Sequence, residues 1–113
     1  MDKRGIRGGD QWRTQDHDEG ITRTIDVSDV GSAAGAVTVP TMAVATYPAG
    51  VDVTATTTSG VMAVAGQVIT MLRLGGAGVE LQEGTDYCIE VRYVKDTNNL
   101  TNRFYVACPD EEP

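Results

Sequence analysis

The stretch LQEGTDYCIEVRY, residues 81–93, has the clearest structural pattern in the chain. From Tyr87 onward, large apolar side chains occupy every second position, which is the period of a β-strand with one buried face. The side chains expected on that face are Tyr87, Ile89, Val91 and Tyr93. This stretch therefore predicts a strand that contributes one face to a hydrophobic core.

A second strand is expected to return from it as a hairpin. The polar run Asp96-Thr97-Asn98-Asn99 is a turn signal, and Phe104, Val106 and Cys108 then share one face. Matching the two apolar faces predicts that Tyr93 lies opposite Phe104 and Val91 opposite Val106. In that register Cys88 and Cys108 point to opposite faces, so we expect no disulfide between them.

The chain before residue 79 has the pattern of several further strands separated by turns. Proline lacks the donor of a strand ladder, so Pro40 and Pro48 are expected to end strands. The expected strands are Ile21–Val27, Val37–Val39, Thr41–Tyr47, Val51–Ala55 and Gln67–Leu74, with a short strand or turn at Val61–Gly66. Together with the hairpin they predict an all-β domain over residues 21–109.

The expected strand at 67–74 has apolar residues on both of its faces. Val68, Leu72 and Leu74 are assigned to the core, which leaves Ile69 and Met71 on the outward face. Two outward apolar residues are either ordinary surface exposure or lie under the N-terminal arm or a neighbouring subunit. Ile69 and Met71 are therefore candidate partner-binding residues.

Residues 1–20 are polar and rich in glycine, and they lack the apolar residues to build a core. We expect an extended N-terminal arm, either packed on its own domain or held by a neighbouring subunit. Trp12, with Arg7 and Arg13 nearby, is the candidate partner-binding group, and packing of Trp12 on its own domain is the alternative. Deleting residues 1–20 is expected to leave the domain folded. Residues 110–113 are expected to form an acidic tail.

Composition narrows the class of partners. The chain has 113 residues, with 16 acidic and 9 basic side chains and a net charge of −7, which disfavours binding to nucleic acid. No apolar run approaches the ~20 residues that span a bilayer, and the first ten residues lack the apolar core of a secretory signal. We therefore expect neither a membrane protein nor an exported one, and a reducing compartment for the two cysteines.

The residues offer little for catalysis, metal binding or cofactor binding. The chain has a single histidine, His17, within the expected arm, so no Ser-His-Asp or Cys-His site is expected. Residues 16–19 carry metal-compatible atoms, but consecutive positions do not converge on one ion. The glycine-rich run 75–78 lacks the Lys-Ser/Thr of a phosphate-binding loop. We expect no enzyme activity, no metal and no cofactor.

The segment from Leu81 to Val91 resembles the beginning of the penultimate strand in fibronectin type III and related immunoglobulin-like sandwiches, with the pattern Leu-x-x-Gly-Thr-x-Tyr. The resemblance implies an immunoglobulin-like (fibronectin type III-like) antiparallel β-sandwich. It also implies three structural roles: Leu81 in the core, Gly84 at a turn, and Tyr87 with its hydroxyl bonded back to the backbone in a tyrosine corner.

A wider region, from Ile25 to Cys108, is similar to small immunoglobulin-like structural proteins of tailed bacteriophages, the fiber-tail adaptor or neck components. The matching segments are Ile25–Ser28, Val68–Gly76, Gly84–Tyr87 and Asn102–Val106. The inserted residues 78–83 and the longer, more basic arm depart from that family. The resemblance implies a non-enzymatic virion protein, synthesised in the host bacterial cytoplasm, that acts as an adaptor in the neck or tail.

The implied partners are other virion proteins of the neck, tail or fiber, and further copies of the chain in a symmetric assembly. Two alternatives remain. One is a capsid decoration protein. The other is an adhesion or carbohydrate-binding immunoglobulin-like module of a bacterial surface protein, in which Trp12 and the tyrosines would stack on sugars. Export is required for the second alternative.

Overall fold

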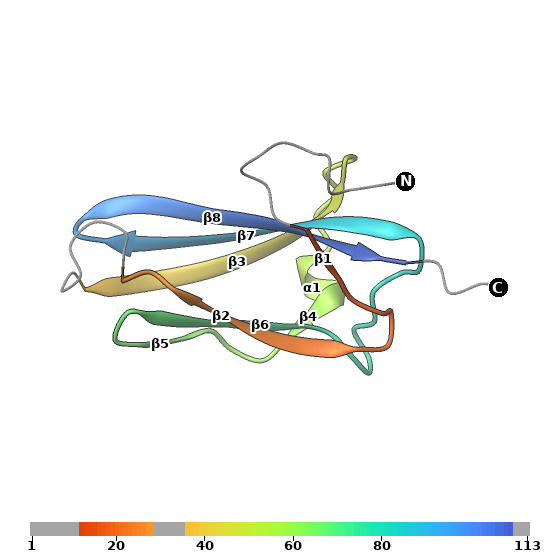
Figure 1. The fold of residues 1–113 in the computed structure, drawn as a ribbon, viewed down its shortest axis with the longest axis horizontal. Helices are drawn as coiled ribbons and strands as arrows, with labels where there is room; N and C mark the ends of the chain where they lie inside the picture. Colours follow the sequence, from red (N-terminus) through yellow and green to blue (C-terminus); the bar gives the residue numbers. More distant parts are fainter. Residues whose placement is uncertain (1–11, 29–35, 110–113) are drawn as a thin grey trace.

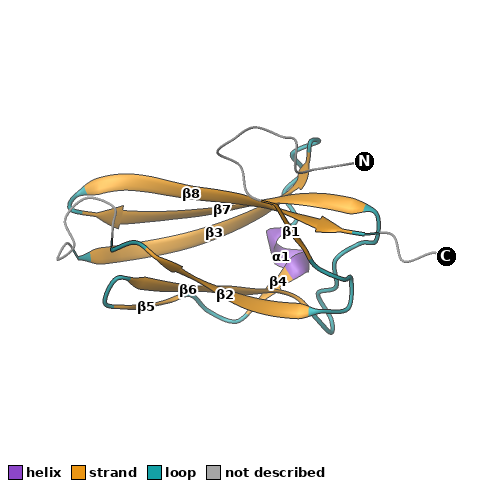
Figure 2. Cartoon of the chain, viewed as in Figure 1, coloured by secondary structure: helices purple, strands orange, loops and turns teal. Residues whose placement is uncertain are grey.

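A computed structural model of the chain describes residues 12–28 and 36–109, which form a sandwich of two facing β-sheets (Figure 1). The first sheet has the order β1-β8-β7-β3, and the second has the order β2-β6-β4 with β5 also paired to β6. Among these residues a single short helix, α1, lies between strands of the two layers (Figure 2). The all-β fold and its sandwich of two sheets are confirmed.

Each sheet is built from strands that are not all consecutive along the chain. The first sheet contains β1 (Trp12–Thr14), β3 (Val37–Tyr47), β7 (Thr85–Lys95) and β8 (Asn98–Cys108). The second contains β2 (Gly20–Asp26), β4 (Thr58–Ser59), β5 (Ala63–Ala65) and β6 (Val68–Gly75), and α1 spans Thr54–Thr57.

The hairpin of β7 and β8 has the expected faces but a different register. Tyr93 pairs with Leu100 instead of Phe104, and Ile89 pairs with Phe104. The turn consists only of Asp96 and Thr97, which both have positive φ, at 54° and 64°. Such a tight turn favours glycine or asparagine, and a β-branched residue rarely adopts it, so the sequence suggested a longer loop.

The register shift leaves the two cysteines apart. Cys88 pairs with Tyr105, and Cys108 pairs with Thr85. Because side chains alternate between the two faces of a sheet, the two thiols lie on opposite faces. Cys88 is half-buried, Cys108 is buried, and they are not joined by a disulfide. The expected absence of this bond therefore agrees with the structure, although the register from which it was derived was wrong.

The expected outward face of β6 is also wrong. Ile69 and Met71 are 0% and 3% exposed and belong to the core together with Leu74. The pairing of β2 with β6 shifts between Thr22 and Thr24, where β6 has one residue more than β2. An extra residue of this kind inverts the alternation of side chains, so positions 69 and 71 face the same side as position 74. Their side chains are therefore not on the surface.

Strand β3 continues through Pro40, where we expected an interruption. Its pairing with β7 shifts between Thr38 and Thr41, and Val39 has a φ of 48°. Because β3 is an edge strand among the described strands of its sheet, the missing donor of Pro40 is tolerated at this bulge. The expected strand 51–55 is reduced to a bridge between Ala45 and Asp52, and α1 follows directly.

The corner before β7 joins the two sheets. Leu81 is 3% exposed, Gly84 has a φ of 78° in the turn, and Tyr87 is 3% exposed. The backbone N–H of Gln82 donates a hydrogen bond of 2.8 Å to the Tyr87 hydroxyl. Burial raises the pKa of Tyr87, while this hydrogen bond acts in the opposite direction. These residues have the burial, turn and hydrogen bond that the resemblance implies for a tyrosine corner.

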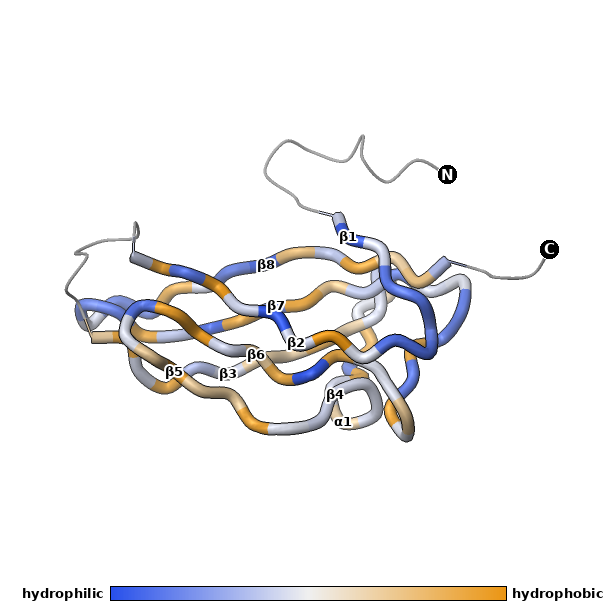
Figure 3. The backbone as a smooth tube through the Cα atoms, turned by 60° about the horizontal axis from the view of Figure 1, so that its bottom comes forward, coloured by the Kyte–Doolittle hydropathy of each residue, from blue (hydrophilic) through white to orange (hydrophobic). Residues whose placement is uncertain are grey.

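Residues 12–20, which were assigned to the arm, pack on their own domain, one of the two arrangements expected for the arm. Strand β1 pairs in parallel with β8, with Trp12 opposite Tyr105 and Thr14 opposite Ala107. The connection from β1 to β2 is largely hydrophilic (Figure 3), yet within it Gln15 is 0% exposed. Residues 12–20 therefore belong to the sandwich. Residues 1–11, including Arg7, lie outside the described residues, as do residues 29–35 and the expected tail 110–113.

Gln15 explains why this polar connection is held in place. Its Nε2 donates to the carbonyl oxygens of Leu74, at 2.7 Å, and Glu19, at 3.0 Å. A Cβ atom added to Gly75, which has a φ of 79°, would lie 2.7 Å from the same Nε2. Only glycine therefore leaves room for Gln15 at the end of β6. The Leu81 N–H also bonds to the carbonyl oxygen of His17, at 3.2 Å.

These contacts predict a difference between two truncations. Removing residues 1–20 is expected to lower the free energy of unfolding by at least ~3 kcal/mol more than removing residues 1–11. The longer truncation deletes β1, the Trp12 ring and the buried Gln15 hydrogen bonds, leaving the Leu74 carbonyl without its partner. Urea denaturation of both truncated chains measures the difference. Equal stability would show that residues 12–20 are an independent arm.

Candidate binding surfaces

Strand β1 separates two surfaces of the domain. Its Trp12 lies beside Tyr105 of β8. Because Tyr105 stands between the core residues Phe104 and Val106 along the strand, Tyr105 and Trp12 lie on the outer face of the first sheet. The next residue, Arg13, points to the other side of the strand, toward the ring of Phe104. Trp12 and Arg13 were expected to bind a partner together, but the strand directs them to opposite faces.

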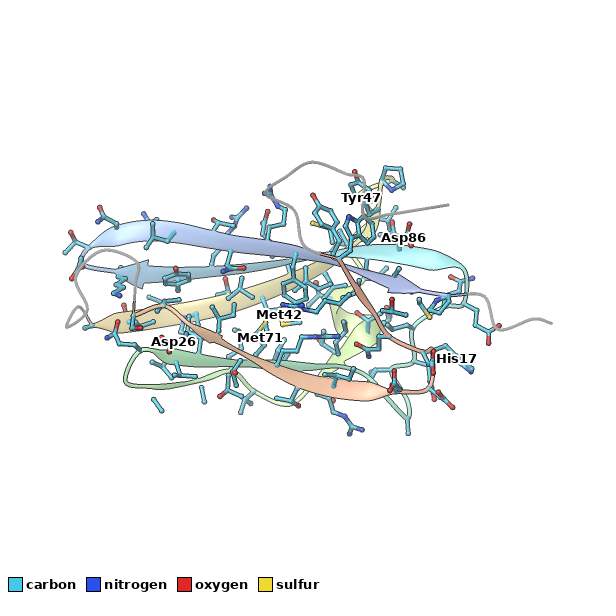
Figure 4. All side chains as sticks on the ribbon, in the orientation of Figure 1. His17, Asp26, Met42, Tyr47, Met71 and Asp86 are labelled. Atoms are coloured by element: carbon cyan, nitrogen blue, oxygen red, sulfur yellow. The ribbon has the colours of Figure 1, made fainter. Side chains whose placement is uncertain are left out.

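The first surface is an aromatic cluster of Trp12, Tyr47 and Tyr105. The Trp12 ring stacks on Tyr105, with centroids 5.0 Å apart and planes at 22°, and it meets Tyr47 edge-on at 5.9 Å. Tyr47 and Tyr105 meet at 4.8 Å. Figure 4 shows Tyr47 outside the two layers, whereas Met42 and Met71 lie between them. Trp12 therefore packs on its own domain, and the cluster remains partly exposed.

The second surface is a groove between the edges of the two sheets, with a volume of about 760 Å³. One wall is formed by β8 from Thr101 to Phe104 and the other by β2 from Thr22 to Ile25. Met71 and Phe104, which are both nearly fully buried, form the apolar part of the lining together with Ile25. Arg13 from β1 and Arg23 from β2 supply its positive charge.

Two guanidinium groups share one aromatic ring in this groove. The guanidinium carbons of Arg13 and Arg23 each lie 5.6 Å from the centre of the Phe104 ring. Arg23 also donates a hydrogen bond of 2.9 Å to Oε1 of Gln15. Burial lowers the pKa of Arg23, the neighbouring charge of Arg13 lowers it further, and Glu19 opposes both effects. The positive charge of Arg13 therefore acts on Arg23 within this groove.

Arg103 also borders the groove, but its guanidinium group pairs with a carboxylate on the outer face of the sheet. Its Nη2 lies 2.5 Å from a carboxylate oxygen of Glu90, a residue that also accepts a hydrogen bond from Arg92. These contacts, above all the hydrogen bond from Arg103, lower the pKa of Glu90. Arg13 and Arg23 are the two cations of the groove that lie over the Phe104 ring.

The residues proposed from the sequence are thus divided among different environments. Trp12 belongs to the aromatic cluster, Arg13 to the groove, and Ile69 to the core. Met71 is also a core residue, although part of it lines the groove. His17 lies 3.1 Å from Glu83, and within residues 12–28 and 36–109 no three His, Cys, Asp or Glu side chains gather to hold a metal.

Three residues of these surfaces, Tyr47, Tyr105 and Arg23, were not singled out from the sequence, although the tyrosines as a group were named for the carbohydrate-binding alternative. For Tyr105 a signal was present, because its place between Phe104 and Val106 puts it on the face opposite the core. Arg23 was assigned only to an alternating strand, and its position opposite Arg13 depends on how the two sheets face each other.

A membrane-spanning helix is absent from the described segments, where the one helix is α1. Comparison of the chain with protein-family models, with curated proteins and with solved structures gives no match.

Proposed function

We propose that this chain is a non-enzymatic structural protein of a tailed phage particle that joins neighbouring proteins of the neck or tail. The observation that carries the proposal is the strand order together with the Tyr87 corner. The order β3-β7-β8 in one sheet and β2-β6-β4 in the other is the order C-F-G and B-E-D of immunoglobulin sandwiches. This agreement supports the immunoglobulin-like fold of the phage proteins that the sequence resembles.

The surfaces support a role in protein binding. The partly exposed aromatic cluster offers large, rigid apolar area at the end of the first sheet, and such residues contribute strongly to protein interfaces. From Val37 to Gly78 the charged residues are only Asp52 and Arg73, so this segment of a strongly acidic chain has little charge to desolvate. These features suit a domain that binds other proteins.

Substitution of Trp12 tests this function. We expect Trp12→Ala to remain folded as an isolated chain but to be incorporated into particles at least ~10-fold less than the parent, because truncating an aromatic anchor removes a large share of the binding energy. Quantitative mass spectrometry of purified particles measures the incorporation. Val61→Ala, at an 82% exposed apolar position, is the matched control and should be incorporated normally.

Labelling electron microscopy of the same particles locates the protein. Label at the neck or tail supports the adaptor role, and label spread over the head identifies a capsid decoration protein instead. Absence of the chain from purified particles, with normal expression in the host, would contradict both roles.

The aromatic cluster also favours a second candidate, a carbohydrate-binding module of a bacterial surface protein. Trp12 and the two tyrosines lie within 6 Å of one another, and aromatic rings of this kind pack against sugar faces. The stacking of Trp12 on Tyr105 covers one face of each ring, which leaves less area for a sugar. Quenching of Trp12 fluorescence by purified host polysaccharide, lost in Tyr47→Ala, would favour this candidate.

A further inference from the structure

The walls of the groove are strand edges. Among residues 12–28 and 36–109, β2 pairs only with β6 and so is the edge of its sheet. On its groove side β8 pairs with β1 only from Tyr105 to Ala107, and its described pairing on this side does not extend to Thr101–Phe104. Backbone groups at an unpaired edge bind extended segments of other chains by adding a strand. The shape of the groove therefore suits an extended peptide.

The charge of the groove selects the side chain of such a peptide. Arg13 and Arg23 each lie 5.6 Å from the centre of the Phe104 ring, and Arg23 is half-buried. The ring face attracts both guanidinium groups and restrains them. A carboxylate bound beside both guanidinium groups accepts charge-assisted hydrogen bonds from them.

The chain's own N-terminal residues are poorly suited to this position by charge. Residues 1–11 contain three basic side chains, Lys3, Arg4 and Arg7, and two acidic ones, Asp2 and Asp10. A nucleic acid is likewise disfavoured, because the net charge of −7 repels a polyanion. A short segment with one or two carboxylates meets only the local positive charge of the groove.

We propose that the groove between β2 and β8 binds an extended acidic segment of a partner protein, with an Asp or Glu carboxylate beside Arg13 and Arg23. This inference rests on the proposed function, because it names the chemistry of the joined partner. The segment lies along the strand edges, and its carboxylate replaces the water around the two guanidinium groups.

Nuclear magnetic resonance titration of the isolated full chain tests the proposal. The probe is the peptide acetyl-Thr-Val-Glu-Val-Thr-amide, and its control has Gln in place of Glu. We expect the acidic peptide to shift the Arg23 side-chain Nε–H and the backbone amides of Thr24 and Asn102. The Gln peptide should bind at least ~10-fold more weakly, because it loses the charge-assisted hydrogen bonds. Raising the salt concentration should weaken binding of the acidic peptide.

Three charge-matched variants complete the test. Arg13→Gln and Arg23→Gln should each raise the dissociation constant at least ~10-fold. Arg92→Gln, whose side chain is 69% exposed and contacts Glu90 on the outer face, should leave it unchanged. Arg23 also donates a hydrogen bond to the buried Gln15, so its substitution can unfold the chain. If Arg23→Gln does not fold, Arg13→Gln on the exposed strand β1 still tests carboxylate binding.

Three results would overturn the proposal. Equal binding of the Gln peptide would exclude carboxylate recognition, and an equal loss in Arg92→Gln would show a nonspecific effect of net charge. Shifts confined to Arg side chains, and reproduced by sodium acetate at the same concentration, would show a simple anion site without an extended segment. None of these results depends on particle incorporation of the Trp12 variant, so the inference and the proposed function fail independently.

Discussion

Tyr87→Ala is expected to lower the free energy of unfolding by about 3–5 kcal/mol, as large aromatic side chains do when they are removed from a core. The ring is 3% exposed and lies in the core cluster with Leu81 and Val106. Its removal leaves a cavity where the turn before β7 meets the sheet, and it also leaves the Gln82 N–H without its acceptor. Urea denaturation followed by circular dichroism measures the change.

Tyr87→Phe is the matched control for this variant. It keeps the ring and removes only the hydroxyl that accepts the 2.8 Å bond from Gln82, so a loss of about 1 kcal/mol is expected. The difference between the two variants separates packing from hydrogen bonding. If Tyr87→Ala unfolds at the same urea concentration as the parent, the ring does not support the corner, and the assignment of a tyrosine corner must be abandoned.

Ile69→Ala is expected to lower the free energy of unfolding by about 2–5 kcal/mol, because the side chain is fully buried between the two sheets. Val64 of β5 and Ile25 of β2 pair with Ile69 on either side, so the cavity cannot be filled by movement of one exposed residue. The measurement is again urea denaturation of the isolated chain.

The alternative for Ile69 is the outward position that simple alternation along β6 assigns to it. In that case Ile69→Ala would leave stability unchanged and would weaken only the contact with a partner. Val61→Ala, at an 82% exposed position, is the control and should change stability by less than about 0.5 kcal/mol. A value for Ile69→Ala as small as that of the control would contradict the buried position.

Local patterns in the sequence predicted several features that depend on residues close together along the chain. The alternation in β7 identified Tyr87, Ile89, Val91 and Tyr93 as core residues, and all four are less than 5% exposed. The turn at Gly84 and the burial of Leu81 were expected from the same stretch through its family resemblance. The sequence predicted these features because a regular strand with one buried face has an apolar residue at every second position.

The sequence pattern did not predict the bulge in the pairing of β6 or the register of the hairpin. The extra residue in β6 reversed the expected positions of Ile69 and Met71. The turn at Asp96 and Thr97 is a different case, because it changed the partner of Tyr93 from Phe104 to Leu100 and kept the faces of the hairpin. Because the side-chain period of a strand is two, a single added residue exchanges its faces. Nothing in the composition of β6, which is apolar on both faces, shows where such a residue lies.

The sequence by itself determined that this chain forms an all-β domain, which strands supply the core, and that its charge disfavours nucleic acid. Only the tertiary structure decided that Gln15 is buried, that Trp12 packs on Tyr105, and that Arg13 and Arg23 meet at one ring. These contacts join residues on different strands, in one case across both sheets. A polar segment such as residues 12–20 has no hydrophobic period, so its place is set by the backbone groups it satisfies in the folded sandwich.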